Sequence, residues 1–195
     1  MNEFDVIIAL CMGIGLAAAS GFRVFLPPFL LSIAVRADAI NVDLTSTPFE
    51  YFDSNVAVIL LGVATLVEFA GYYVPWVDNL LDSIASPAAV VAGTGMTALV
   101  LAETDPVIQW TLAIVAGGGV SGVVQGATVV TRGFSTMFTG GLANPVVSTG
   151  ENIASIILAI LAIVIAPLAA ILVGILMYMI AKKWMQNRSK AQASG

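Results

Sequence analysis

Long apolar segments alternate with short polar ones along almost the whole chain. The clearest apolar segment runs from Ile108 to Arg132, and its only charged residue is the last one. A helix of this length crosses the roughly 30 Å hydrocarbon core of a bilayer. Gly118, Gly122 and Gly126 form two overlapping GxxxG steps on one helix face, where a second helix can approach closely. We therefore interpret this helix as the centre of a membrane bundle.

The other long apolar segments predict further membrane helices. They cover residues 6–20, 55–73, 87–102 and 148–181. Near the first of them, Gly13, Ala17 and Gly21 again lie four residues apart, which indicates a second face for close helix packing. The polar loop over residues 36–53 separates the N-terminal segments from the next helix.

Two shorter apolar segments look interrupted. Residues 21–35 contain the pair Pro27 and Pro28, and residues 133–147 are rich in glycine and hydroxyl side chains and end near Asn144. Each segment is either a short crossing or a re-entrant half-helix. Broken backbone at membrane depth is tolerated only against protein or a water-filled cavity. These two segments therefore point to the place of a polar site.

The C-terminal segment is expected to be one long helix. Ser148 and Glu151 have the spacing of a capping box at its start, and Pro167 predicts a kink in it. The residues that follow, 181–195, form the only basic cluster of the chain. Because positive charges stay on the cytoplasmic side, we expect the C-terminus and its basic tail to be cytoplasmic.

The number of crossings depends on the two interrupted segments. If both cross, there are seven membrane segments, the N-terminus is outside, and Arg23 and Arg132 mark the cytoplasmic boundary. If both re-enter, there are five. We favour seven because both arginines then obey the positive-inside rule. The predicted fold is an all-α, polytopic transmembrane helix bundle of five to seven segments with two broken or re-entrant stretches, in a single integral membrane domain over 1–195.

Composition explains this pattern and excludes several functions. Hydrophobic residues make up 59% of the chain and charged residues 10%, whereas a soluble domain carries about 25% charged residues. A net charge of −5 is the opposite of a nucleic-acid footprint, so we expect no nucleic-acid partner. The single Cys11 rules out an intrachain disulfide.

The chain contains no histidine, which removes the commonest metal ligand and proton carrier. It also leaves Ser121 without the base that the similar Gly-Val-Ser-Gly loop of rhomboid proteases needs, so Ser121 is interpreted as a packing residue. We predict no catalytic residue, no metal and no cofactor, and we expect the protein not to be an enzyme.

Ionisable residues within apolar segments are the candidates for a functional site, because burying an isolated charge there costs about 2.5–3.5 kcal/mol. Glu68 is the clearest case. In a functional reading it handles a proton or cation, or it is a partner for Arg23. In a structural reading it is half of an ion pair that only stabilises the fold. Asp78 and Asp82 share a helix face and either join Glu68 in a carboxylate cluster or face interfacial water.

The remaining candidates have plainer alternatives. Glu151 is more readily a helix cap than a ligand, and Asn144 either presents free carbonyls or forms a simple turn. Gln125 is expected to bond across helices. The predicted ion- or substrate-binding residues are Arg23, Glu68, Asp78, Asp82, Asn144 and Glu151.

Several motifs together resemble one known family. They are Gly21-Phe-Arg-Val-Phe-Leu-Pro27, the segment from Glu68 to Asp82, Ser86-Pro-Ala-Ala, the helix over 117–126 and the segment from Thr139 to Glu151. The chain is similar over nearly its whole length to a family of small bacterial inner-membrane proteins catalogued as a domain of unknown function. The resemblance implies a bacterial inner-membrane location and no particular activity.

We therefore expect a small transporter or channel-like protein for an ion or small solute. The alternative is a non-transporting scaffold or assembly factor that docks partner helices through its glycine faces, and a lipid-modifying enzyme ranks last. The expected partners are the lipid bilayer and a second copy of the chain in a homodimer, because so few short segments make a thin bundle.

Overall fold

The computed structural model describes the backbone of residues 2–74 and 77–193, and within these ranges every side chain except those of 78–79 and 187–193. All its regular elements are helical, as predicted. They are α1 (Glu3–Phe22), α2 (Leu26–Arg36), α3 (Asn55–Gly71), α4 (Val77–Val100), α5 (Pro106–Leu112), the π-helical η1 (Ala113–Gly118), α6 (Gly119–Thr139), α7 (Asn144–Val164) and α8 (Ala166–Ala193).

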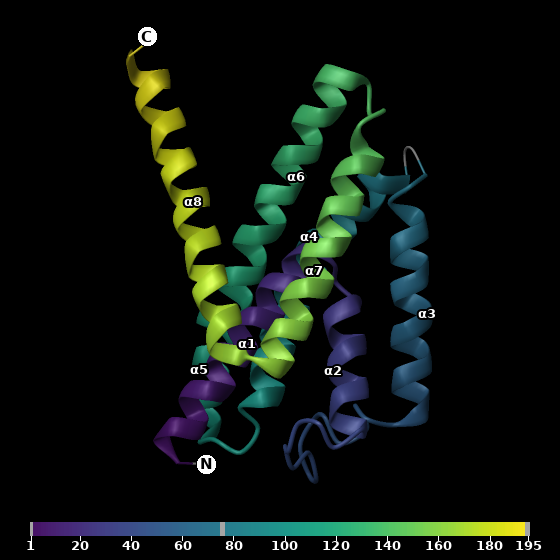
Figure 1. Cartoon of the computed structure of the whole chain (residues 1–195), viewed down its shortest axis with the longest axis vertical. Coiled ribbons are helices and arrows are strands. Elements are labelled where there is room, and N and C mark those ends of the chain that lie inside the picture. The colour runs from purple at the N-terminus through teal and green to yellow at the C-terminus, as the bar shows by residue number, and fades with distance from the viewer. Residues whose placement is uncertain (1, 75–76, 194–195) are drawn as a thin grey trace.

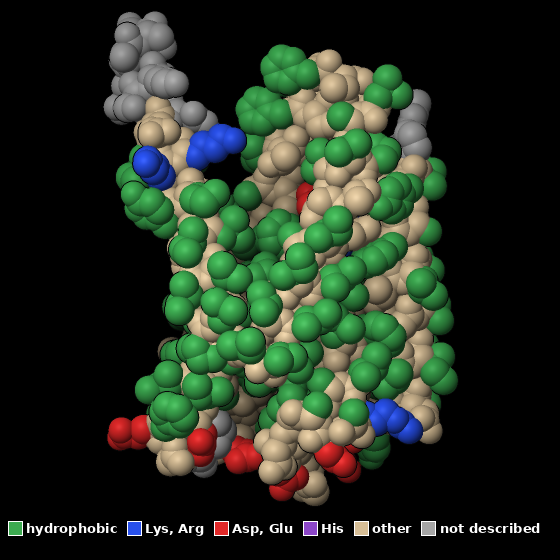
Figure 2. Space-filling model, in the orientation of Figure 1, with side chains coloured by type: hydrophobic (Ala, Val, Ile, Leu, Met, Phe, Trp, Pro, Cys, Tyr) green, Lys and Arg blue, Asp and Glu red, His purple; other side chains and the backbone are tan. Residues whose placement is uncertain are grey.

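The helices run up and down along the long axis, with the N-terminus at the lower end and the C-terminus at the upper end (Figure 1). Five helical stretches in the described chain are long and apolar enough to cross a membrane, and α2 and α3 are shorter apolar helices. A broad apolar belt lies between the lower end, where acidic side chains gather beside a basic one, and basic side chains near the upper end (Figure 2). The protein thus has the architecture of a multi-pass membrane protein.

The central helix is α1, and not the predicted segment over 108–132. A capping box between Asn2 and Asp5 starts α1, which then packs against α4, α6, α7 and α8. Its residues Ala17, Ala18 and Ala19 are fully buried, because small side chains let four helices approach one axis. The segment over 108–132 lies beside α1, within the continuous helical run of α5, η1 and α6.

The first interrupted segment does contain a break, but the prolines do not cause it. The chain leaves the helix at Arg23, which has extended backbone angles, and α2 begins at Leu26. Pro27 and Pro28 lie in the first turn of α2, where the missing N–H groups cost nothing. In Figure 1, α2 runs back down beside α3 toward the lower end.

The second interrupted segment is broken as predicted, but it is neither a short crossing nor a re-entrant half-helix. Residues 133–139 continue α6, and the turn that follows uses Gly140 and Gly141, which have positive φ angles of 62° and 90°. The helix α7 then begins at Asn144, so the stretch is a tight helix–turn–helix and not a re-entrant segment. None of residues 133–139 is buried, so α6 continues here without much packing and ends only where Gly140 adopts the left-handed conformation.

The predicted long C-terminal helix is in fact two helices. Ile165 has non-helical backbone angles, and Pro167 lies in the first turn of α8, so the chain reverses direction there where a kink was predicted. The expected capping box at Ser148 and Glu151 was also wrong, because both residues are buried inside α7. The described chain therefore holds seven apolar helices, divided differently from the predicted seven.

Candidate functional site

The break after α1 turns Arg23 into the bundle interior, where it is fully buried. One guanidinium nitrogen donates hydrogen bonds to Glu151 Oε2 at 2.9 Å and to the carbonyl oxygen of Phe22 at 2.8 Å. The other donates to the carbonyl oxygen of Ser148 at 3.0 Å, and Nε donates to Asn152 Oδ1. Arg23 therefore links the end of α1 to two successive turns of α7.

A second arginine reaches the same carboxylate from α6. Arg132 is 2% exposed, and its guanidinium donates to Glu151 Oε2 and, at 2.5 Å, to Asp82 Oδ1 on α4. Arg23, Asp82, Arg132 and Glu151 thus form one buried group, which we call the ionic cluster. Arg132 was expected to mark the membrane boundary, but it lies inside the bundle because it has two carboxylate partners there.

The aromatic ring of Tyr72 completes the cluster. The Cζ atom of Arg23 lies 4.2 Å from the ring centroid and that of Arg132 lies 3.9 Å from it. Both guanidinium groups therefore make cation–π contacts with one buried ring. This arrangement brings two positive charges close together in a medium of low dielectric, where they depend on the shared Glu151 carboxylate.

Glu68 does not form the ion pair that was one of the roles predicted for it, and its handling of a proton or cation stays a prediction. Its carboxylate accepts hydrogen bonds from the backbone N–H groups of Val24 at 2.7 Å and of Phe25 at 3.1 Å. It forms none of the ion pairs found among the described residues. Glu68 thus satisfies the free donors at the break between α1 and α2, and it fixes the backbone that presents Arg23.

The structure brings together three of the six predicted site residues, Arg23, Asp82 and Glu151. Asn144 lies about two helical turns before Glu151, and its amide donates to Thr136 Oγ1 at 3.1 Å in the helix–turn–helix. The predicted Asp78 side chain lies outside the described residues.

A family model, Domain of unknown function (DUF4126), matches residues 10–186. The chain belongs to this family. The matched region contains every residue of the ionic cluster. No curated protein and no solved structure matches the chain significantly.

Sequence reasoning missed four residues of the site in this family member. They are the ring of Tyr72, the amide of Asn152, the carbonyl of Ser148 and the cluster role of Arg132. Tyr72 follows Glu68 by one helical turn, which was the one available signal. The others looked like ordinary helix-surface and boundary residues, because nothing local shows which way they face.

The predicted packing residues lie in different environments. A Cβ atom on Gly13 would lie 2.8 Å from Thr97, one on Gly21 would lie 2.6 Å from Val124, and one on Gly118 would lie 2.7 Å from Thr94. At Gly122 the nearest atom, on Val90, would be 3.2 Å away, and at Gly126 nothing lies within 4 Å. The first three glycines therefore let helices of the same chain touch, whereas Gly126 faces open space.

That open space is part of a groove between α6, α7 and α8, which we call the lateral groove. Its volume is about 1000 Å³, and Figure 2 shows it as a hollow between the upper part of α8 and the rest of the bundle. The side chains of Val123, Val130, Leu176 and Met177 contribute to its apolar walls, and Glu151 also lines it. The ionic cluster thus borders a space that opens sideways.

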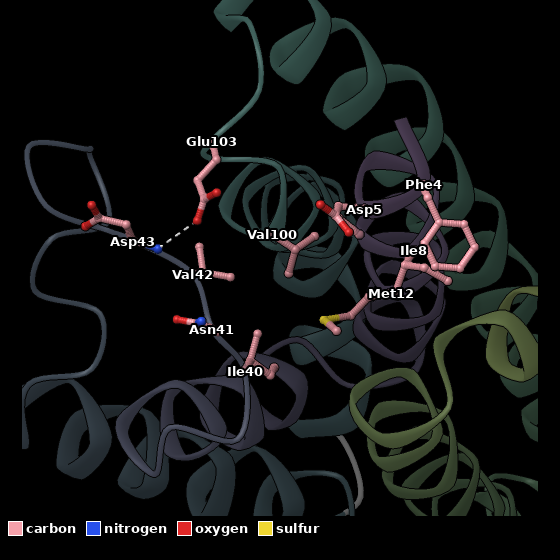
Figure 3. Close-up of a pocket in the computed structure, with 11 residues that line it drawn as sticks. Phe4, Asp5, Ile8, Met12, Ile40, Asn41, Val42, Asp43, Val100 and Glu103 are labelled. Carbon is pink, nitrogen blue, oxygen red and sulfur yellow. Dashed lines mark hydrogen bonds between the residues drawn. The ribbon is translucent and has the colours of Figure 1, made fainter. Parts of the chain in front are cut away.

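A second cavity, of about 550 Å³, lies at the acidic end of the molecule (Figure 3). Asp5, Asp43 and Glu103 surround it together with apolar side chains of α1, and Glu103 accepts a hydrogen bond from the backbone N–H of Asp43 at 3.2 Å. Hydrogen bonds from Thr45 hold the pKa of the exposed Asp43 carboxyl below its usual range. Three carboxyl groups therefore line this cavity.

Proposed function

We propose that this protein is a small transporter or channel-like membrane protein in which the ionic cluster handles an ion or a small solute. The observation that carries the proposal is the burial of two arginines and two carboxylates within membrane-type helices. Buried ion pairs add little net stability compared with apolar residues of the same volume. Ionisable groups at this depth usually lie on the path of an ion or substrate.

The geometry supplies a way for the cluster to respond to such a ligand. Glu151 Oε2 accepts from both guanidinium groups, while the buried Glu151 Oε1 and Arg132 Nε have no hydrogen-bond partner among the described residues. A proton or cation on Glu151 cancels the negative charge that Arg23 and Arg132 share. The two guanidinium groups then repel each other, and α1 and α6, which carry them, separate.

The alternative is a scaffold that docks partner helices through its glycine faces. It has less support, because Gly13, Gly21 and Gly118 already contact side chains of the same chain. A homodimer and an inner-membrane location with a cytoplasmic C-terminus remain predictions. We assign no residue a catalytic role.

The test is a flux assay with purified protein in liposomes, screened for proton, sodium, potassium, chloride and phosphate movement. We expect flux of one of these ions to fall at least tenfold in Glu151→Gln. The double variant Arg132→Gln/Glu151→Gln keeps the net charge of the cluster and should also be inactive. Glu50→Gln, which changes the same residue type on the exposed loop, should behave as wild type.

Size-exclusion profile and helicity report whether each variant is folded. Absence of flux for every ion in the wild-type protein refutes the proposal as tested. Full activity of a folded Glu151→Gln variant refutes the role of the cluster.

A further inference from the structure

The lateral groove has the size and position of a lipid site. Apart from Phe22 at the end of α1, its lining residues belong to three candidate membrane spans, Pro106–Thr139, Asn144–Val164 and Ala166–Gln186. Its volume of about 1000 Å³ lies at the upper end of the range for small-molecule sites. The groove exists because α8 packs against the bundle only in its first part, where Ala169 and Val173 are buried, and no described side chain after Val173 is buried.

The walls of the groove require an apolar occupant. Valine, leucine and methionine side chains of α6 and α8 line most of it, and the hydroxyl groups of Thr128 and Thr131 already donate to backbone carbonyls of α6. Exposing this surface to water is unfavourable, and the groove opens toward the hydrocarbon region. An acyl chain of the surrounding bilayer satisfies both conditions.

The mouth of the groove is positively charged. Lys183 and Trp184 line it near the upper end, where the spans end and the basic tail begins. Tryptophan is typical of the headgroup level, and a lysine there attracts acidic headgroups. Among the described residues, Glu151 supplies the one carboxylate that lines the groove, and it is paired with both arginines. The charge at the mouth therefore favours an anion.

We propose that the lateral groove binds an acidic phospholipid from the surrounding bilayer. One acyl chain lies between α6 and α8 and passes Gly126, and the phosphate is held at Lys183. This site does not depend on transport by the ionic cluster, so it can exist whether or not the protein carries an ion.

A second copy of the chain fits the groove less well. Two copies with the same orientation in one membrane would bring their basic tails to the same level, so that Lys182 and Lys183 of each copy face like charges. A lipid phosphate is attracted by these lysines, whereas the tail of a second copy is repelled by them.

The experiment uses the full chain in mild detergent, titrated with phosphatidylglycerol or phosphatidylcholine, with the retained lipid counted by native mass spectrometry. We expect phosphatidylglycerol to half-saturate the protein at about fivefold lower concentration than phosphatidylcholine, the effect of one lysine near the phosphate. Lys183→Gln should abolish this preference. Lys182→Gln, a change of the neighbouring lysine that does not line the groove, should keep it.

A second pair of variants tests the groove itself. Gly126→Leu places a side chain in the groove without a clash, because nothing lies within 4 Å of the added Cβ, and it should reduce retention of both lipids at least tenfold. Gly119→Leu is the matched control, since its Cβ is equally unobstructed and the residue does not line the groove. It should retain lipid as wild type does.

Three results would overturn the proposal. One is normal lipid retention in Gly126→Leu, and another is an equal loss of preference in the two lysine variants. The third is a lipid-free dimer that Gly126→Leu separates into monomers, which would show that a second copy occupies the groove.

Discussion

Replacing Glu151 by glutamine tests the central claim that one carboxylate holds two arginines together. The guanidinium Cζ atoms lie 4.2 and 3.9 Å from the centroid of the Tyr72 ring, so they are at most about 8 Å apart. At an effective dielectric constant of about 20, their repulsion is then about 2 kcal/mol or more. In the wild-type protein the Glu151 carboxylate offsets it.

Glu151→Gln removes this charge while the neighbours keep other partners. Arg23 retains the carbonyl oxygens of Phe22 and Ser148, and Arg132 retains Asp82. We therefore expect a loss near the lower end of the usual range for a broken buried pair, about 3 kcal/mol in the free energy of unfolding. The total stability of such a domain is about 5–15 kcal/mol, so the variant remains folded at 25 °C.

The assay is reversible unfolding by sodium dodecyl sulfate in mixed micelles, applied to a double-mutant cycle. Arg132→Gln, Glu151→Gln and the double variant give a coupling free energy, which we expect to be about 2 kcal/mol, because the double variant has no unpaired charge from this pair. Losses that add within about 0.5 kcal/mol would contradict the shared-carboxylate reasoning, and so would a Glu151→Gln variant as stable as wild type.

Two further stability predictions follow from other contacts and use the same unfolding assay. Glu68→Ala leaves two backbone N–H groups at the start of α2 without an acceptor and should cost about 2–4 kcal/mol of unfolding free energy. Glu68→Gln keeps one oxygen and should cost about half as much. Equal losses in the two variants would refute this role of Glu68. Gly93→Ala places a Cβ 2.4 Å from Ser121 Oγ and should cost about 1–3 kcal/mol. The control Gly133→Ala meets no atom within 4 Å and should change stability by less than about 1 kcal/mol. A Gly93→Ala variant as stable as wild type would show that the α4–α6 contact is looser than described.

The sequence by itself determined that this chain is an all-helical bundle built for a membrane. This information is local, because each segment of about 20 apolar residues carries its own transfer free energy into the bilayer, whatever its neighbours do. The same reasoning identified the break near Arg23. It failed for residues 133–147 and at Pro167, because proline and glycine show where a helix is weak and not whether the chain bends, turns or reverses there.

The pairing of charges was decided only by the tertiary structure. Arg23 and Glu151 are 128 residues apart in the chain, and Asp82 and Arg132 are 50 apart. Whether such residues meet depends on how α1, α4, α6 and α7 are rotated and at what depth each lies. Close packing of the helices against α1 sets these positions, and no local sequence pattern encodes them. For that reason Arg132 resembled a boundary residue and Glu151 a helix cap, although the fold brings both to one buried point beside Tyr72.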